Sequence, residues 1–237
     1  MRGSEVTTAW SLAPRVALAP VSALPNDGRH DWLGAAERER LQRISSLHRR
    51  QQFLAGHWLT RELVARCSGG ASESWEITST PEGAPLLVSR AGGTSSLRMS
   101  LSHSGDWVVC AIASAAVGVD LETSRQSRRW RELAEQVLSP VECRRLQDLP
   151  EEALEAAFHL HWTIKEAWGK RDGQGLRADV ARRQTAWECA PEAAQVITWQ
   201  STGRCLALAC GTASSAQLEG WNDAPAARHW RIDSLAI

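Results

Sequence analysis

Between residues 31 and 66, apolar side chains recur at steps of three and four positions, which is the spacing of one face of a helix. A polar break at Ser45 and Ser46 predicts that this stretch forms two helices instead of one. Gly69 and Gly70 follow the last apolar position, and glycine commonly ends a helix. We therefore expect two consecutive helices that stop at this glycine pair.

A second helical region follows later in the chain and has the same spacing. Within residues 130–147, Ser139 and Glu142 form a capping box, and Pro140 occupies the first helical position, so a new helix is expected to start there. Residues 151–171 continue as a longer helix.

Apolar runs bounded by glycine, proline or serine predict strands in the rest of the chain. They cover residues 7–14, 75–79, 85–89, 97–104, 107–114, 118–122, 185–190, 195–201 and 205–211. Helices followed by strands, twice over, are typical of an α+β chain made of two similar halves. We place these halves at residues 1–115 and 116–237, although no internal sequence repeat is recognised that would support a duplication.

Composition and charge exclude several classes of protein. Lys and Arg total 27 and Asp and Glu total 27, so the zero net charge argues against a duplex nucleic-acid binder while allowing a local basic patch. No apolar run reaches the about 18 residues that a membrane helix needs, and the first residues show no secretory signal. The six cysteines form neither a Cys-x-x-Cys pair nor a zinc pattern with histidine, which favours reduced thiols in a cytoplasmic protein.

Two carboxylates on a predicted strand are the first candidates for chemistry. Asp120 and Glu122 are two positions apart, so both point to the same side of the strand. A hard cation such as Mg²⁺ would neutralise their repulsion. A strand end that reaches solvent would give the same pattern.

A second candidate lies on the predicted long helix. Trp162, Glu166 and Lys170 are spaced by four and share a face, and Lys165 lies about 100° around the helix from Glu166. An ordinary Glu–Lys surface pair explains this spacing equally well.

Ser102 and His103 form a third candidate. They face opposite sides of one strand, so they cannot act together as a nucleophile and its base, and His103 is either an anion ligand or a core histidine.

The order of three motifs resembles the Sfp-type 4'-phosphopantetheinyl transferases. These motifs are Ser-His-Ser-Gly-Asp-Trp at 102–107, Gly-Val-Asp-Leu-Glu at 118–122 and Trp-Thr-Ile-Lys-Glu-Ala-Trp-Gly-Lys at 162–170. The family shows a Ser-His strand, a Gly-(Ile/Val)-Asp-x-Glu motif and a Trp-x-x-Lys-Glu-x-x-x-Lys motif in the same order. The resemblance covers roughly residues 31–210.

The resemblance implies transfer of 4'-phosphopantetheine from coenzyme A to a serine of an apo acyl or peptidyl carrier protein. That carrier would serve fatty acid, polyketide or nonribosomal peptide synthesis. It also implies a monomer of two pseudo-symmetric halves with the active site between them. Asp120, Glu122 and Glu166 match the ligands of Mg²⁺, or of Mn²⁺, and Lys170 matches a phosphate-contacting lysine. The serine proton would pass to Glu166 or to a metal-bound water, and we favour Glu166.

The same resemblance suggests where coenzyme A binds. His103 matches a histidine that contacts a coenzyme A phosphate, with Ser102 beside it, and Lys165 matches a further lysine of the motif. Arg40 and Arg43 are candidates for the 3'-phosphate, since a guanidinium suits phosphate geometry, although an exposed arginine face fits them as well.

Two departures and two alternatives stay open. Ala84 stands where the family often has a basic residue between glycine and proline, and Gln51 and Gln52 stand where a basic residue is common in the upstream helix. The alternatives are a catalytically inert coenzyme A or carrier-protein binder and a Mg²⁺-dependent nuclease. The retained carboxylates argue against the first, and the zero net charge argues against the second.

Overall fold

The computed structural model describes residues 12–24, 30–81, 83–124, 129–173, 175–211 and 215–234. The helices are α1 (Ala35–Arg43), α2 (Leu47–Ser68), α3 (Trp130–Val137), α4 (Pro140–Gln147), α5 (Glu151–Arg171) and α6 (Ala178–Ala181), with 3-10 turns at Val21–Ala23, Ser72–Ser74 and Pro191–Ala193. The strands are β1 (Arg15–Pro20), β2 (Trp75–Ser79), β3 (Pro85–Ser89), β4 (Arg98–Ser104), β5 (Trp107–Ala113), β6 (Val117–Thr123), β7 (Gln184–Glu188), β8 (Val196–Ser201), β9 (Arg204–Cys210), β10 (Gln217–Glu219) and β11 (Arg228–Ser234). No helix in the described ranges combines the length and the apolar character needed to cross a membrane.

The helices begin and end largely where the sequence predicts. The first region divides into α1 and α2, and the Ser46 side chain caps α2 by accepting a hydrogen bond from the Arg49 amide. Gly69 ends α2 with a left-handed φ of 73°. The capping box of Ser139 and Glu142 at the start of α4 is also present. The expected break between α1 and α2, the end of α2 at Gly69 and the start of α4 at the capping box are therefore confirmed.

The first predicted strand is displaced. β1 begins at Arg15, whereas the prediction was residues 7–14; residues 12–14 precede β1, and residues 7–11 lie outside the described part of the chain. The short elements α6, β10 and β11 were not predicted. β10 adds three residues to β1 in parallel, and β11 pairs with both β7 and β8. Such short or partly exposed segments carry little apolar periodicity.

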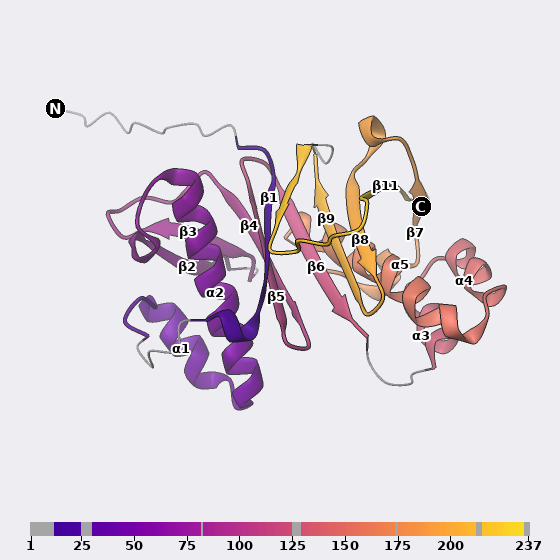
Figure 1. Cartoon of the computed structure of the whole chain (residues 1–237), viewed down its shortest axis with the longest axis horizontal. Coiled ribbons are helices and arrows are strands. Elements are labelled where there is room, and N and C mark those ends of the chain that lie inside the picture. Colours follow the sequence, from indigo (N-terminus) through magenta and orange to yellow (C-terminus); the bar gives the residue numbers. More distant parts are fainter. Residues whose placement is uncertain are drawn as a thin grey trace.

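The two halves of the chain repeat one arrangement. In the first, β1 pairs with β5 and β5 pairs with β4; in the second, β6 pairs with β9 and β9 pairs with β8, all antiparallel. The long helices α2 and α5 occupy corresponding places after β1 and β6 (Figure 1). The α+β class and the pseudo-symmetric arrangement are thus present in the structure.

Alternating side chains divide the core into layers. Val109 and Val119 belong to an apolar cluster shared by the two sheets, whereas Cys110 packs with Leu63 of α2. Ala207 of β9 packs with Ile164 of α5 in the same way. Each sheet therefore has one face against its own helix and the other against the opposite sheet (Figure 1).

Serine side chains join β4 to β6, where the two halves meet. Ser100 Oγ accepts a hydrogen bond from the amide of Val119 at 3.0 Å, and Ser104 Oγ accepts one from the amide of Thr123 at 3.1 Å. These hydroxyls satisfy backbone groups of β6 that a neighbouring strand would otherwise pair. The same junction brings the first and third sequence motifs beside the second.

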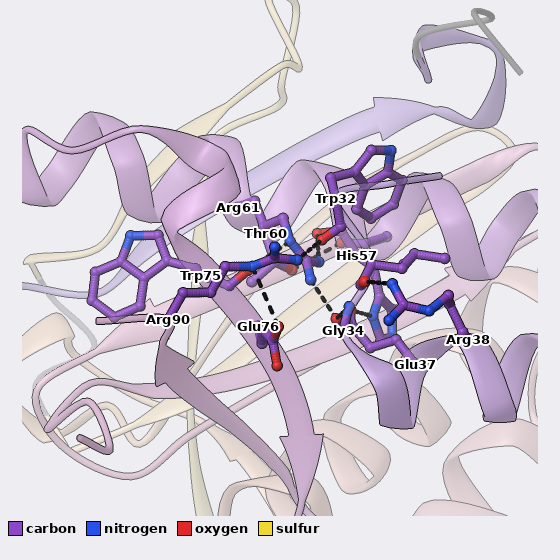
Figure 2. Close-up of polar contacts among 12 residues, drawn as sticks. Trp32, Gly34, Glu37, Arg38, His57, Thr60, Arg61, Trp75, Glu76 and Arg90 are labelled. Carbon is purple, nitrogen blue, oxygen red and sulfur yellow. Dashed lines mark hydrogen bonds and ion pairs between the residues drawn. The ribbon is translucent and has the colours of Figure 1, made fainter. Parts of the chain in front are cut away.

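Each half also contains a buried ion cluster at the start of a short helix. In the first half, His57 and Arg61 of α2 converge on the carboxylate of Glu37, whose Oε2 also accepts the amide of Gly34 (Figure 2). Burial alone would raise the pKa of Glu37, but the hydrogen bonds from His57 and Arg61 lower it to about 2. A fixed carboxylate at this position caps α1 and ties it to α2.

The second half repeats this cluster with Glu142 of α4, His161 and Lys165. Lys165 Nζ lies 2.9 Å from Glu142 Oε2, and both side chains are completely buried. The repeat is visible in the sequence as His-Trp-Leu-Thr-Arg-Glu at 57–62 and His-Trp-Thr-Ile-Lys-Glu at 161–166. This similarity between the two halves is a sequence sign of their duplication that the search for repeats missed.

Candidate active site

Asp120 on β6 receives contacts from both halves. Its Oδ1 accepts hydrogen bonds from Ser102 Oγ at 2.8 Å and from Lys170 Nζ at 2.6 Å. The residue is only 4% exposed, and its buried Oδ2 has no hydrogen-bond partner among the residues that the structure describes. Since a buried carboxylate oxygen without a partner is costly, this atom has capacity for a further positive ligand.

Gly118 explains why Lys170 reaches Asp120. A Cβ at Gly118 would lie 2.0 Å from the Ala167 carbonyl oxygen and 2.4 Å from the Arg171 amide, both in the backbone of α5. Only glycine allows α5 to approach β6 this closely. The glycine of the Gly-Val-Asp-Leu-Glu motif thus sets the position of the lysine at the end of the next motif.

Glu122 points in the same direction as Asp120, as the two-residue spacing predicts. Its Oε1 accepts a hydrogen bond from Trp162 Nε1 at 3.1 Å, and its Oε2 accepts one from Ser104 Oγ at 3.2 Å. Two carboxylates of β6 therefore face two serines of β4, and Trp162 of α5 holds the second carboxylate.

Glu166 lies on the same side of α5 as Trp162 and Lys170 and is half-buried. Burial raises its pKa, the nearby carboxylate of Asp120 raises it further, and Lys170 opposes this effect; the resulting pKa is about 7. A carboxyl group with such a pKa can take up or release a proton near neutrality. The raised pKa of Glu166 also reflects the negative charge of the nearby carboxylates, which a bound cation would reduce.

The carboxylates fit a divalent cation by their chemistry rather than by a preformed cage. Oxygen ligands are those that Mg²⁺ and Mn²⁺ prefer; among the described residues Asp120 Oδ2 has no hydrogen-bond partner, and nearby carboxylates help to raise the pKa of Glu166. Within the described ranges, no three His, Cys, Asp or Glu side chains are already gathered as metal ligands. Lys170 at present neutralises Asp120, so binding a cation requires these side chains to adjust.

A cleft of about 1490 Å³ leads to this site. Helix α2, strand β4 and the end of α5 line it, and Ser102 and Lys170 connect it to the carboxylates. Its basic side chains come from both halves of the chain: Arg40, Arg49, Arg98, Lys170, Arg171 and Arg177. A cationic cleft of this size suits an elongated anionic ligand.

His103 lies on the wall of the cleft next to an arginine that sequence analysis missed. Arg49 Nη1 lies 2.7 Å from His103 Nδ1 and 3.0 Å from Gln52 Oε1. Burial first, and then the charges of Arg49 and Lys170, lower the pKa of His103 to about 4. The ring is therefore neutral at pH 7. Arg49 is one turn before Gln52, and this spacing was the sequence signal that could have identified it.

The two predicted phosphate arginines separate in the structure. Arg40 lines the cleft, and its guanidinium carbon lies 5.9 Å from the centre of the Phe53 ring. Arg43 forms an exposed ion pair with Glu39 and does not line the cleft. A spacing of three residues on α1 therefore does not bring the side chains of Arg40 and Arg43 to the same cavity.

Lys165 is the clearest correction to the expected site. It was expected to contact coenzyme A, but its side chain is completely buried and points away from the cleft. Its ammonium donates to the Ala181 and Gln184 carbonyls and pairs with Glu142. Because Lys165 lies about 100° around the helix from Glu166, it faces the core of the second half. Its role here is structural.

A second, smaller hollow of about 200 Å³ adjoins the site. Glu122 borders it together with the aromatic side chains of Trp130, Phe158 and Trp162. The rings of Phe158 and Trp162 stack at 6.3 Å. The carboxylates therefore lie between a cationic cleft and an apolar hollow.

Comparison with known proteins agrees with this geometry. The family model of the 4'-phosphopantetheinyl transferase superfamily matches residues 116–233, and the model of the N-terminal part of 4'-phosphopantetheinyl transferase matches residues 29–115. The chain is 30% identical over 145 residues to the 4'-phosphopantetheinyl transferase HetI of Nostoc, covering 61% of each chain. It is 28% identical over 158 residues to a 4'-phosphopantetheinyl transferase of Bacillus subtilis, covering 66% of this chain and 67% of that protein.

A putative 4'-phosphopantetheinyl transferase of Synechocystis is 28% identical over 164 residues, which are 69% of this chain and 66% of that protein. The matched part thus spans 61% of the Nostoc relative and 66% of the Synechocystis relative. Because the two family models follow one another along nearly the whole described chain, the chain belongs to the 4'-phosphopantetheinyl transferase superfamily.

Proposed function

We propose that this chain transfers the 4'-phosphopantetheine group of coenzyme A to a serine hydroxyl of an apo acyl or peptidyl carrier protein. The observation that carries the proposal is the end of the cleft, where Lys170 and Ser102 meet the buried carboxylate of Asp120. The names of the relatives, 4'-phosphopantetheinyl transferases, support the same group transfer.

The reaction exchanges one phosphorus–oxygen bond for another. The serine oxygen forms a bond to the β-phosphorus of coenzyme A, the bond from this phosphorus to the bridging oxygen breaks, and adenosine 3',5'-bisphosphate leaves. Lys170 lines the cleft, and in our proposal it donates hydrogen bonds to the diphosphate, where negative charge develops. In our proposal, Glu166 accepts the serine proton.

The carboxylates would hold a divalent cation in this reaction. Asp120, Glu122 and Glu166 are its ligands in our proposal, and we propose Mg²⁺, with Mn²⁺ as a possible substitute. When bound, the cation supplies positive charge to the diphosphate. His103, Ser102 and Arg40 line the cleft and would contact the rest of coenzyme A.

The proposed partners follow from this reaction. The carrier protein would belong to fatty acid, polyketide or nonribosomal peptide synthesis. We propose that the chain acts as a monomer, because residues from both halves of a single chain line the cleft, and that it is cytoplasmic.

Chromatography of the leaving product tests the proposal. The protein is incubated with coenzyme A, Mg²⁺ and an apo carrier protein, and adenosine 3',5'-bisphosphate is quantified. We expect one product molecule per carrier, and none with EDTA or with a carrier whose acceptor serine is alanine. Product that appears equally with the alanine carrier would indicate hydrolysis. Coenzyme A binding without product from several types of carrier would identify an inert binder.

A further inference from the structure

The carboxylate of Asp120, proposed above as a cation ligand, already holds an ammonium group of the chain itself. Lys170 Nζ donates to Asp120 Oδ1 at 2.6 Å and to Ser102 Oγ at 3.2 Å, and the Ser102 hydroxyl donates to the same Oδ1 at 2.8 Å. A metal ion on Asp120 Oδ2 would share one carboxylate with this ammonium. Two positive charges so close to each other repel, so Lys170 and the cation compete for Asp120.

This ion pair differs from the other lysine–carboxylate pair of α5. Lys165 Nζ lies 2.9 Å from Glu142 Oε2 and also donates to two backbone carbonyls, and both side chains are completely buried. Lys170, by contrast, is 26% exposed and lines the cleft. Because water and ligands reach Lys170 from the cleft, its ammonium can leave Asp120 without becoming buried and unpaired.

The cleft provides Lys170 with a second anionic partner when coenzyme A binds. In the proposed reaction, Lys170 donates to the diphosphate, and its present partner Ser102 lines the same cleft. An ammonium that moves from the carboxylate to the diphosphate exchanges one anion for another and stays compensated. The same movement returns the full negative charge of Asp120 to the cation site. Coenzyme A and the cation then favour each other's binding, and by linkage the effect is equal in both directions.

We propose that Lys170 is a displaceable counter-ion, which compensates Asp120 in the free chain and moves to the diphosphate when coenzyme A binds. This inference rests on the proposed function and adds to it a coupling between the two ligands. Without coenzyme A, Lys170 competes with the cation and makes its binding weak. With coenzyme A in place, Asp120 faces the cation site without a competing ammonium.

The affinity for Mn²⁺ in the absence of coenzyme A tests the competition. Electron paramagnetic resonance measures free Mn²⁺ during titration of the wild-type chain, Lys170→Met and Lys170→Arg. We expect Lys170→Met to bind Mn²⁺ about tenfold or more tightly than the wild type, because the competing charge is gone. Lys170→Arg keeps that charge and should stay within about threefold of the wild type. Unchanged or weaker Mn²⁺ binding by Lys170→Met would overturn the competition.

Arg171→Met is the matched control for a general effect of charge. Arg171 is the next residue of α5, lines the same cleft and is 21% exposed, but its guanidinium pairs with Asp172 at 2.9 Å and lies 3.7 Å from the Trp168 ring centre. Its removal should change the Mn²⁺ affinity by less than about twofold. An equal gain in affinity from both methionine variants would show that the overall charge of the cleft controls cation binding, and would overturn the proposal.

The same titrations at saturating coenzyme A test the coupling. Coenzyme A should tighten Mn²⁺ binding to the wild-type chain by a factor at least about fivefold larger than in Lys170→Met, because that variant has no ammonium to move. Any direct contact between the cation and the diphosphate contributes to both chains alike. Equal factors in the two chains would overturn the exchange of partners by Lys170.

These outcomes are distinguishable from a failure of the proposed function. If the wild-type chain transfers phosphopantetheine but Lys170→Met gains no affinity for Mn²⁺, the counter-ion role is wrong and the transferase proposal stands. If the wild-type chain binds neither coenzyme A nor Mn²⁺, even when both are present, both proposals fail.

Discussion

At the scale of single residues, Asp120 is the group on which the site depends. It is buried, one oxygen is shared by Ser102 and Lys170, and the other has no hydrogen-bond partner. Its charge also contributes to the raised pKa of Glu166. Removing this carboxylate should therefore affect cation binding and catalysis more than folding.

Asp120→Ala should reduce phosphopantetheine transfer by roughly 10²-fold or more, because the carboxylates and Lys170 would no longer be held around the diphosphate. The midpoint of thermal unfolding should change little, because relief of the repulsion with Glu166 offsets the loss of the ion pair with Lys170. Enzyme assays and calorimetry measure the two effects. Full activity of this variant at ordinary Mg²⁺ concentrations would contradict the assignment of Asp120 as a cation ligand.

Lys165 and Lys170 are five residues apart on α5, about 1.4 helical turns, and should respond differently to substitution. Lys165→Met leaves Glu142 buried without its ammonium partner, so we expect a loss of about 3–5 kcal/mol in the free energy of unfolding. Lys170→Met should cost less stability, because Lys170 is 26% exposed and water reaches this ion pair, and it should lower activity. Urea unfolding and transfer assays on both variants check this. A Lys165→Met protein of normal stability but weak coenzyme A affinity would favour the role expected from the sequence.

At the scale of elements, the approach of α5 to β6 sets the geometry of the site. Gly118→Ala would place a Cβ against the backbone of Ala167 and Arg171, which cannot yield as a flexible side chain would. We expect a loss of about 1–3 kcal/mol in the free energy of unfolding together with loss of activity. Gly211→Ala is the matched control, since no atom of the described residues lies within 4 Å of the added carbon. Equal stability of the two variants would show that the close contact is not needed.

The paired ion clusters at α1 and α4 predict how stability depends on pH. The folded pKa values of Glu37 and Glu142 are each lowered from 4.5 to about 2, mainly by hydrogen bonds that outweigh the effect of burial. Their stabilisation is complete above about pH 4.5 and is lost as the pH falls through about 2. Burial also lowers the pKa of His57, so its contribution declines in the same direction once the pH drops below its ordinary value of 6.5.

Denaturant titrations between pH 7 and pH 2.5 measure this dependence. The free energy of unfolding should decrease with falling pH, and Glu37→Gln should show a lower value at pH 7 and a shallower decrease. An unchanged slope in Glu37→Gln would mean that the cluster does not stabilise the folded state through this charge.

At the scale of the whole molecule, the two halves share one arrangement of strands, but only the second half carries the carboxylates proposed to bind a cation. Cys110 and Ala207 are the fourth residues of β5 and β9, and their strand partners are Ala17 of β1 and Asp120 of β6. Glu122 corresponds by the same register to Ala19. The first half thus has alanines where the second has the proposed cation ligands, and it contributes arginines and His103 to the cleft instead.

This asymmetry predicts one cation site and one coenzyme A site per chain. Titration with Mn²⁺, followed by electron paramagnetic resonance, should give a stoichiometry of one, and Asp120→Ala should abolish that site. A stoichiometry of two in the wild-type chain would show that the first half also holds a cation.

The sequence predicts the elements and the chemical residues of the second half better than the shape of the cleft. The Asp-x-Glu spacing and the helical Glu–Lys spacing are local, so the motifs could be placed on β6 and α5 from periodicity alone. The choice between Arg43 and Arg49 depends on how α1 and α2 pack, and the burial of Lys165 depends on Glu142, which is distant in the sequence. Such long-range packing gives no periodic signal in the sequence. The repeated His-Trp motif at 57–62 and 161–166 does indicate that the two halves share a buried ion cluster.

The most direct test of the account is the intact mass of an apo carrier protein after incubation with this chain, coenzyme A and Mg²⁺. The account predicts a gain of one phosphopantetheine unit that EDTA abolishes and that Asp120→Ala fails to produce. An unchanged mass across acyl and peptidyl carriers, with a folded protein that binds coenzyme A, would contradict the proposal that this site transfers the group.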